Sequence, residues 1–355
     1  MSVSKRSFQL VACLVVLVFT FVSLACNGGG SGSVSLQGAG ATFPNPLYQK
    51  WLSEYGKLHP NVRIDYQSIG SGGGIKQLKE QTVDFGASDA PMKDDDLKSA
   101  PGEVLHIPTV LGAVIITYNL QGISQPLRFS SEVIADIFLG KIKKWNDPII
   151  RADNPGVTLP ANDITVVHRS DGSGTSAVFT DYLSKVSAEW KEKVGSGTSP
   201  SWPIGIGGKG NEGVTGQVKN TPNTIGYVEL AYAVQNKLPV ALIKNASGNF
   251  VEPSIDAVTA AAAASAANTP EDLRVSITNA SGAQAYPISS YTYILVYKEQ
   301  KDAGKGKALV DFLWWGIHEG ENFAKELQYA PLPDDIVKRA EAKINSITAG
   351  GAALR

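Results

Sequence analysis

The polar segment 168–175 (HRSDGSGT) constrains the fold most, because it joins a predicted strand to a predicted helix. Residues 163–167 (DITVV) are rich in β-branched side chains and favour a strand. Apolar residues then recur at helical spacing over 177–183. Free helix N–H groups, hydroxyls and the Arg169 guanidinium therefore converge, and these are the donors that a buried oxyanion needs. The alternative is an ordinary Ser/Gly loop in which Ser173 is the helix N-cap.

Two other segments repeat this design. Segment 38–46 (GAGATFPNP) precedes an apolar helical pattern, with Asn45 predicted as its N-cap and Pro46 in its first turn. Segment 69–74 (IGSGGG) follows a strand-like run and precedes another helical pattern. Three such junctions indicate several helix N-termini that are aimed at one anion, whereas three ordinary loops are the alternative.

A carboxylate follows a fourth segment, 83–87 (VDFGA), which is predicted to be a short buried strand. Asp89 comes just after it, two residues before Pro91. A carboxylate suits an anion site if the anion carries a proton, as phosphate does near neutral pH. Sulfate has no such proton and would face Asp89 with a second negative charge. The alternative is that Asp89 only stabilises a turn.

The N-terminus reads as a leader segment. Residues 8–25 are almost wholly apolar and follow Lys5 and Arg6, and Cys26 is followed by a Gly/Ser-rich tether. This pattern resembles a bacterial lipoprotein signal, which implies cleavage after residue 25 and lipid attachment to Cys26. Ser23 departs from that pattern, in which Leu is usual. An uncleaved membrane anchor is the alternative, and in both cases the body lies outside the cytoplasm.

Composition limits the remaining function classes. The 355 residues carry a formal net charge of −1, and no basic face stands out, so we expect no nucleic-acid partner. Removal of residues 1–25, which contain two basic and no acidic residues, brings the charge to −3. The two cysteines are Cys13 and Cys26, so we expect no disulfide in the mature body.

The body alternates between strand-like and helix-like patterns, which favours an α/β fold. Breaks are expected near Pro108, Pro203 and Pro287. The predicted strands include 104–118, 164–167, 224–228, 240–243 and 291–297, and the predicted helices include 131–139, 254–267, 308–327 and 333–347. Ligands of such folds bind at the carboxyl ends of strands, where the polar segments lie.

These motifs together resemble one family, the phosphate-binding protein of the bacterial ABC phosphate transporter. The resemblance covers residues 35–347. It is carried by segments 38–44, 70–74, 84–91, 140–145, 169–175, 202–205 and 225–229.

The resemblance implies which residues bind phosphate. Asp89 accepts the proton of the ligand, Arg169 supplies a charge-assisted pair, and Asp171 orients Arg169. Hydroxyls and backbone N–H groups complete the cage, while His168 stays outside it. The implied phosphate ligands are Thr42, Phe43, Ser71, Asp89, Arg169, Asp171, Ser173, Gly174 and Thr175.

The resemblance also implies a two-lobed type II periplasmic-binding-protein fold, with the ligand in the interlobe cleft and two hinge crossings. The expected boundaries are a signal peptide at 1–25, a tether at 26–34, one lobe at 35–110 plus 286–355, and a second lobe at 111–285. The implied partners are inorganic phosphate, permease subunits of the importer, and a membrane through lipid on Cys26. We expect a monomer with no cofactor and no metal.

Enzyme functions find less support. Segment 205–210 (GIGGKG) has G-x-G-x-x-G spacing, but no buried strand is predicted before it, which argues against a dinucleotide site. The four histidines show no metal-ligand spacing, and Ser173 has no identifiable general base. We therefore predict a binding protein and not an enzyme, with a secreted phosphatase and a surface scaffold as alternatives.

Overall fold

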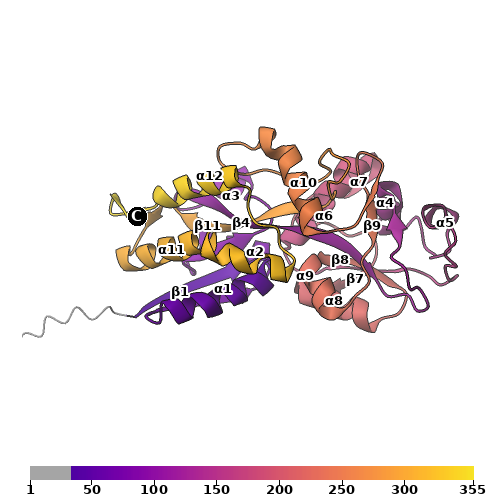
Figure 1. Ribbon diagram of the computed structural model, residues 1–355, viewed down its shortest axis with the longest axis horizontal. Helices are drawn as coiled ribbons and strands as arrows, with labels where there is room; N and C mark the ends of the chain where they lie inside the picture. The colour runs from indigo at the N-terminus through magenta and orange to yellow at the C-terminus, as the bar shows by residue number, and fades with distance from the viewer. Residues whose placement is uncertain (1–32) are drawn as a thin grey trace, which may run out of the picture. The chain divides into compact units, whose positions relative to one another are not determined.

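The computed structural model describes residues 33–355, an α/β unit in which helices surround a large mixed sheet (Figure 1). The predicted signal peptide, Cys26 and most of the predicted tether lie outside these residues. The first strand, β1 (Val34–Gly40), begins at the last residue of the predicted tether. No helix in the described part of the chain is both long and apolar enough to cross a membrane.

An eight-stranded mixed sheet forms the centre of this unit. Strands β2, β1 and β3 are parallel, β11 and β4 are antiparallel to their neighbours, and β8, β6 and β7 are again parallel. In spatial order the strands are β2 (Val62–Ser68), β1, β3 (Phe85–Ser88), β11 (Ser289–Tyr297), β4 (Val104–Tyr118), β8 (Thr224–Glu229), β6 (Thr165–Arg169) and β7 (Ile206–Gly208). Two small sheets contain β10 (Phe250–Val251), β9 (Leu242–Lys244) and β5 (Arg128–Phe129), and β12 (Glu299–Gln300), β13 (Thr348–Ala349) and β14 (Ala352–Ala353).

Strand β4 joins the two halves of the sheet. Its residues 104–113 pair with β11, and Val114–Tyr118 pair with β8. Every residue of β4 after Val104 is buried, as its nearly continuous apolar and β-branched sequence requires of a central strand. The prediction of a strand at 104–118 is therefore confirmed.

Helices pack on both halves of the sheet (Figure 1). Helices α1, α2 and α11 pack on β1–β3, and α8 and α9 on β6–β8. The helices are α1 (Asn45–Leu58), α2 (Ser71–Lys79), α3 (Asp94–Lys98), α4 (Ser131–Phe138), α5 (Pro148–Asp153), α6 (Gly174–Val186), α7 (Ala188–Lys193), α8 (Gly210–Asn220), α9 (Leu230–Asn236), α10 (Ile255–Ser265), α11 (Ala303–Gly316) and α12 (Asp334–Asn345).

Two predictions about helices are wrong. Asn45 does not cap α1, because its side-chain oxygen accepts a hydrogen bond from Gln49 Nε2 (3.1 Å) and the cap residue is Pro44. A single helix was predicted over 308–327, but the α-helix ends at Gly316 and two short 3₁₀ helices follow it. Close packing of Gly316 and Gly320 on the Trp51 ring accompanies this change of path.

Pro108 does not break its strand as predicted but lies at an irregularity inside it. Pro108 pairs with Tyr293 and Val110 pairs with Thr292, so Thr109 is the extra residue of a β-bulge. Proline lacks the N–H that a regular ladder uses, and bulges are one of the places where a sheet tolerates it. The Thr109 hydroxyl donates to the Thr292 carbonyl oxygen (3.2 Å) and so holds the bulge in place.

Glycine permits the close contact between α2 and the ends of β1 and β3. A Cβ atom at Gly74 would lie 2.5 Å from both Ala39 O and Gly40 Cα. A Cβ atom at Gly56, inside α1, would have no heavy atom of its surroundings within 4 Å.

Gly74→Ala should therefore destabilise the protein by about 1–3 kcal/mol, because the added methyl group forces backbone atoms apart. Gly56→Ala is the matched control and should stabilise by roughly 0.5–1 kcal/mol, since alanine favours a helix. Chemical denaturation followed by circular dichroism measures both free energies of unfolding. Equal effects of the two substitutions would contradict the packing argument.

Candidate functional site

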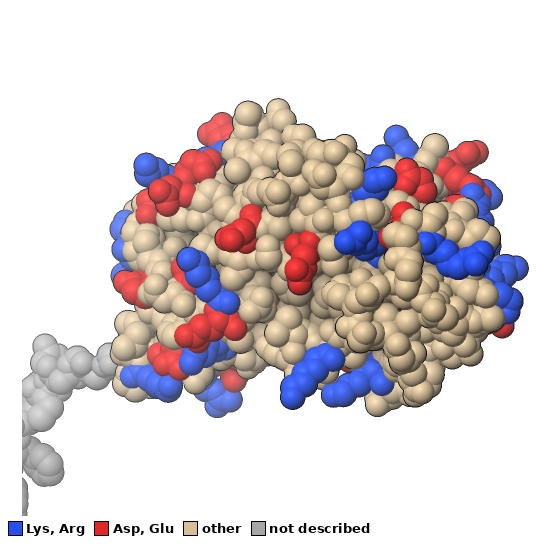
Figure 2. All heavy atoms as spheres, turned by 45° about the vertical axis from the view of Figure 1, so that its right-hand side comes forward, with Lys and Arg blue, Asp and Glu red and all other residues tan. Residues whose placement is uncertain are grey.

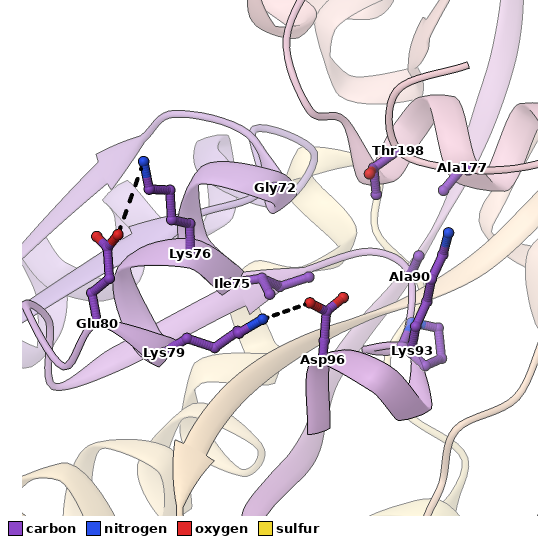
Figure 3. Close-up of a pocket in the computed structure, with 12 residues that line it drawn as sticks. Gly72, Ile75, Lys76, Lys79, Glu80, Ala90, Lys93, Asp96, Ala177 and Thr198 are labelled. Carbon is purple, nitrogen blue, oxygen red and sulfur yellow. Dashed lines mark hydrogen bonds and ion pairs between the residues drawn. The ribbon is translucent and has the colours of Figure 1, made fainter. Parts of the chain in front are cut away.

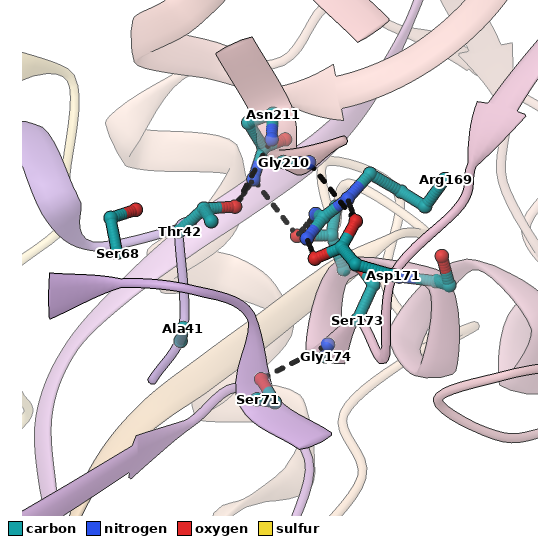
Figure 4. Close-up of polar contacts among 12 residues, drawn as sticks. Ala41, Thr42, Ser68, Ser71, Arg169, Asp171, Ser173, Gly174, Gly210 and Asn211 are labelled. Atoms are coloured by element: carbon teal, nitrogen blue, oxygen red, sulfur yellow. Dashed lines mark hydrogen bonds and ion pairs between the residues drawn. The ribbon is translucent and has the colours of Figure 1, made fainter. Parts of the chain in front are cut away.

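Four strand-to-helix junctions lie at one site, and Figure 4 shows their polar contacts. Three of them, which precede α1, α2 and α6, are the junctions singled out in the sequence. The fourth lies between β7 and α8, where Gly210 has φ +71° and begins the helix. Helix N-termini present unpaired N–H groups, so the fold concentrates donors here.

Arg169 and Asp171 form a buried ion pair at the site. Arg169 Nε donates to Asp171 Oδ1 (2.8 Å) and Nη2 donates to Oδ2 (2.6 Å), while the Arg169 side chain is only 1% exposed. Burial raises the pKa of Asp171, but the hydrogen bonds and charge of Arg169 outweigh this effect and leave the pKa lowered. Asp171 Oδ1 also accepts from Gly210 N (3.0 Å), which attaches α8 to the pair.

Ser71 connects the start of α2 with the start of α6. Its Oγ accepts from Gly174 N (3.0 Å) and from Asp89 N (3.3 Å). The resemblance implies that the Gly174 N–H faces the ligand directly, whereas in this structure it donates to the Ser71 hydroxyl. Gly72 N also donates to Gly172 O (2.9 Å), so the two segments are in direct backbone contact.

The Asp89 carboxylate is fully buried and only half satisfied. Thr292 Oγ1 donates to its Oδ1 (2.9 Å), while Oδ2 has no hydrogen-bond partner among residues 33–355. A Cβ atom at Gly174 would lie 2.5 Å from that Oδ2, so the free oxygen faces the start of α6. Burial raises the pKa of Asp89 to about 7, against the lowering effects of the Thr292 hydroxyl, the Arg169 charge and the Thr175 hydroxyl.

Asn211 links Thr42 with Thr175. Its Nδ2 donates to Thr42 Oγ1 (2.7 Å) and to Thr175 Oγ1 (3.1 Å), and its backbone N donates to Thr42 Oγ1 (3.1 Å). Arg169 Nη1 is 3.4 Å from Thr175 Oγ1. All four side chains are buried, so this network joins the loop before α1 to the loops before α6 and α8.

Three tyrosines hold the loop before α1 by its carbonyl groups. Tyr66 OH donates to Ala41 O (2.6 Å), Tyr232 OH donates to Thr42 O (2.5 Å), and Tyr329 OH donates to Phe43 O (2.6 Å). Burial raises the pKa of each of these tyrosines well above its usual value, so all three remain protonated donors.

Ser173, Phe43 and His168 have different surroundings in the structure. Ser173 caps α6 as one reading of the sequence expects, because its Oγ accepts from Ser176 N (3.0 Å). Phe43 is fully buried, with its ring against Tyr329. His168 lies apart from these contacts, since its ring stacks on Trp202 with centroids 5.0 Å apart.

A pocket of about 380 Å³ lies next to this site, beside the contact between Gly72 and Gly172. Its lining includes Lys76, Lys79 and Lys93. Lys76 forms an ion pair with Glu80, and Lys79 forms one with Asp96, as Figure 3 shows. On the face in Figure 2, basic and acidic side chains are interspersed and do not form one continuous basic stripe.

Sequence reasoning missed Asn211, Thr292 and the three tyrosines. The segment that contains Asn211 has a glycine-rich junction before a helix, which is the same signal as in the other three junctions. Thr292 and the tyrosines lie in segments without a polar motif of their own, and only the folded chain brings them to the site.

Comparison with known proteins identifies the family. Residues 27–314 match the PBP superfamily domain. Phosphate-binding protein PstS of Xylella fastidiosa (strain 9a5c) is 49% identical over 311 residues, which cover 87% of this chain and 85% of that protein. PstS of Pasteurella multocida is 45% identical over 333 residues, 94% of each chain.

The fold agrees with solved structures. The crystal structure of a phosphate-binding protein from Stenotrophomonas maltophilia superposes with a TM-score of 0.66 at 21% identity, over 87% of this chain and 93% of that chain. The prediction of a two-lobed periplasmic-binding-protein fold is therefore confirmed. The chain belongs to the PBP superfamily and, within it, to the family of the phosphate-binding proteins PstS.

Proposed function

We propose that this chain binds inorganic phosphate outside the cytoplasm and delivers it to an ABC importer, as a binding protein and not as an enzyme. The curated relatives, at 45–49% identity over most of the chain, are named phosphate-binding proteins. The observation that carries the proposal is a buried cage that holds both a fixed cation, Arg169, and a carboxylate oxygen, Asp89 Oδ2, that has no hydrogen-bond partner in the described part of the chain.

Arg169 is the cation of the proposed phosphate site. A guanidinium has five N–H donors, and Arg169 uses three of them within residues 33–355, two toward Asp171 and one toward Thr175. Two donors are then left for phosphate oxygens. Asp171 fixes the plane of the guanidinium, so those donors are held ready before the anion arrives.

The loop before α1 supplies further donors. Because three tyrosine hydroxyls occupy the carbonyl groups of residues 41–43, these carbonyls are held away from an anion. The Phe43 N–H and the Thr42 hydroxyl then complete the cage with Ser71, Ser173 and Thr175, and Gly174 contributes by donating to the Ser71 hydroxyl.

The lobes that enclose phosphate are proposed to divide within β4. Its pairing changes from β11 to β8 between Ala113 and Val114, close to the proposed boundary at residues 110 and 111. The return crossing is proposed near residues 285 and 286, just before β11. Phosphate bound by Ser71 and Asp89 on one side and Arg169 on the other would hold the lobes closed. The permease subunits would receive phosphate from this monomer.

Titration of the purified body with phosphate and with sulfate, together with an assay for phosphomonoester hydrolysis, tests the proposal. Phosphate binding that is much tighter than sulfate binding at pH 8, without hydrolysis, supports it. Hydrolysis would indicate a phosphatase, and the absence of any binding would indicate a scaffold.

Arg169→Ala should nearly abolish phosphate binding, at a cost of roughly 2–5 kcal/mol, because a buried charge-assisted contact is lost. Arg169→Lys should also weaken binding clearly, since an ammonium group lacks the planar fork. Isothermal titration calorimetry measures both, and the matched control is Arg63→Ala, because the Arg63 side chain on β2 is 77% exposed. Affinity of Arg169→Ala within a few-fold of the parent would refute the role of Arg169.

Asp89 should make the selectivity of the site depend on pH. Its pKa of about 7 means that the carboxylate is charged at pH 8 and largely protonated at pH 5. Ionised Asp89 accepts the proton of phosphate but repels sulfate, whereas protonated Asp89 donates to sulfate. Sulfate affinity should therefore rise about tenfold for each unit that the pH falls toward 7, and level off below it.

Asp89→Asn is the decisive variant for this prediction. It removes the charge and offers an N–H₂ group, so sulfate binding should become measurable at pH 8 and lose its pH dependence, while some phosphate binding remains. Paired calorimetric titrations of parent and variant at pH 5 and pH 8 measure this. A variant that retains phosphate binding but still excludes sulfate places the discrimination elsewhere in the cage.

The proposed anchor is lipid on Cys26, which the sequence of the leader and the Gly/Ser tether support. Cys26→Ser should release the body from membranes or leave the precursor uncleaved, because the thiol is the site of lipid attachment. Membrane fractionation and mass spectrometry of the mature N-terminus report the outcome. Cleavage at another residue, with no lipid on Cys26, would show that the anchor prediction is wrong.

A further inference from the structure

Asn211 is the most highly connected polar side chain at the site that the predicted motifs did not include. It is the second residue of α8, in the first turn, where backbone N–H groups lack partners within the helix. Its N–H donates to Thr42 Oγ1, and its Nδ2 donates to both Thr42 Oγ1 and Thr175 Oγ1. Asn211 is fully buried, so water does not satisfy these groups instead.

The amide orientation of Asn211 is fixed by the backbone. Its Oδ1 accepts a hydrogen bond from Glu229 N at 2.9 Å, and a backbone N–H can only donate. The opposite orientation would place the NH₂ group against that N–H. The Nδ2 hydrogens must therefore face Thr42 and Thr175.

The two threonine hydroxyls are thereby filled as acceptors. A hydroxyl has two acceptor lone pairs and one hydrogen. Thr42 Oγ1 receives both of its hydrogen bonds from Asn211, and Thr175 Oγ1 receives one from Asn211 and one from Arg169 Nη1. Each hydroxyl can then only donate.

We propose that Asn211 is a positioning residue that sets the hydrogen-bond polarity of the cage, so that Thr42 and Thr175 act solely as donors to phosphate. The inference rests on the proposed function. Donors oriented in advance need no reorganisation when the anion binds, and this lowers the cost of binding.

Ser71 provides an internal comparison. Its Oγ also accepts two hydrogen bonds, but from the backbone N–H groups of Gly174 and Asp89. Its polarity is therefore set without Asn211. If Asn211 acts through the threonine hydroxyls, its removal must affect Thr42 and Thr175 but leave the contribution of Ser71 unchanged.

A double-mutant cycle tests this coupling. Phosphate affinity is measured by calorimetry for Asn211→Ala in the parent and in a Thr42→Val/Thr175→Val background. We expect a loss of roughly tenfold in the parent, the equivalent of about one hydrogen bond, and a loss of less than about twofold in the background that lacks the hydroxyls. In a Ser71→Ala background the tenfold loss should persist.

An equal loss in all three backgrounds would overturn the proposal and make Asn211 merely structural. Asn211→Asp covers the case in which the alanine variant does not fold, because it keeps the shape and the Glu229 contact. Its carboxylate accepts from both hydroxyls and so reverses their polarity. We expect Asn211→Asp to lower the phosphate affinity of the parent by more than about a hundredfold. In the Thr42→Val/Thr175→Val background the fold-loss of affinity should be smaller by a factor of at least about ten. Equal losses would again overturn the proposal, whereas a parent that binds no phosphate would contradict the proposed function itself.

Discussion

The buried pair of Arg169 and Asp171 is the interaction on which the rest of the site depends. A guanidinium that is 1% exposed needs a partner, and Asp171 supplies it through two hydrogen bonds. The same carboxylate accepts from the first residue of α8, so the pair also positions Asn211. Gly70 must be glycine beside it, because a Cβ atom there would lie 2.3 Å from Asp171 Oδ2.

This pair leaves the site without net positive charge, so the attraction for an anion has another source. Asp171 balances Arg169, and Asp89 adds a negative charge when it ionises. Besides the two remaining Arg169 N–H groups, the donors come from the N-termini of four helices and from hydroxyls whose lone pairs are already occupied. The sequence indicated this arrangement, since a body with a net charge of −3 has little general attraction for anions.

The sequence predicted those parts of the fold and site that depend on local patterns. Glycine-rich junctions before helices, the Ser173 cap and the long apolar run of β4 all carry their signal within a few residues. Asn211 and Thr42 are 169 residues apart, and nothing local marks their contact. Asn45 was predicted wrongly because its side chain accepts a hydrogen bond from Gln49, four residues further on, and lies near Glu212 instead of capping α1.

The irregularity at Pro108 shows how a local sequence feature reaches the chemistry of the site. The bulge in β4 accommodates Pro108 and shifts the register with β11 between Thr292 and Tyr293. Thr292 donates to Asp89 Oδ1, so that Oδ2 is the oxygen of this fully buried carboxylate that lacks a partner among residues 33–355. Without that hydroxyl, burial would raise the pKa of Asp89 further, and the group would be protonated over more of the neutral range. An acceptor for the proton of phosphate must be ionised near pH 7, so the bulge in β4 bears directly on whether Asp89 can discriminate between phosphate and sulfate.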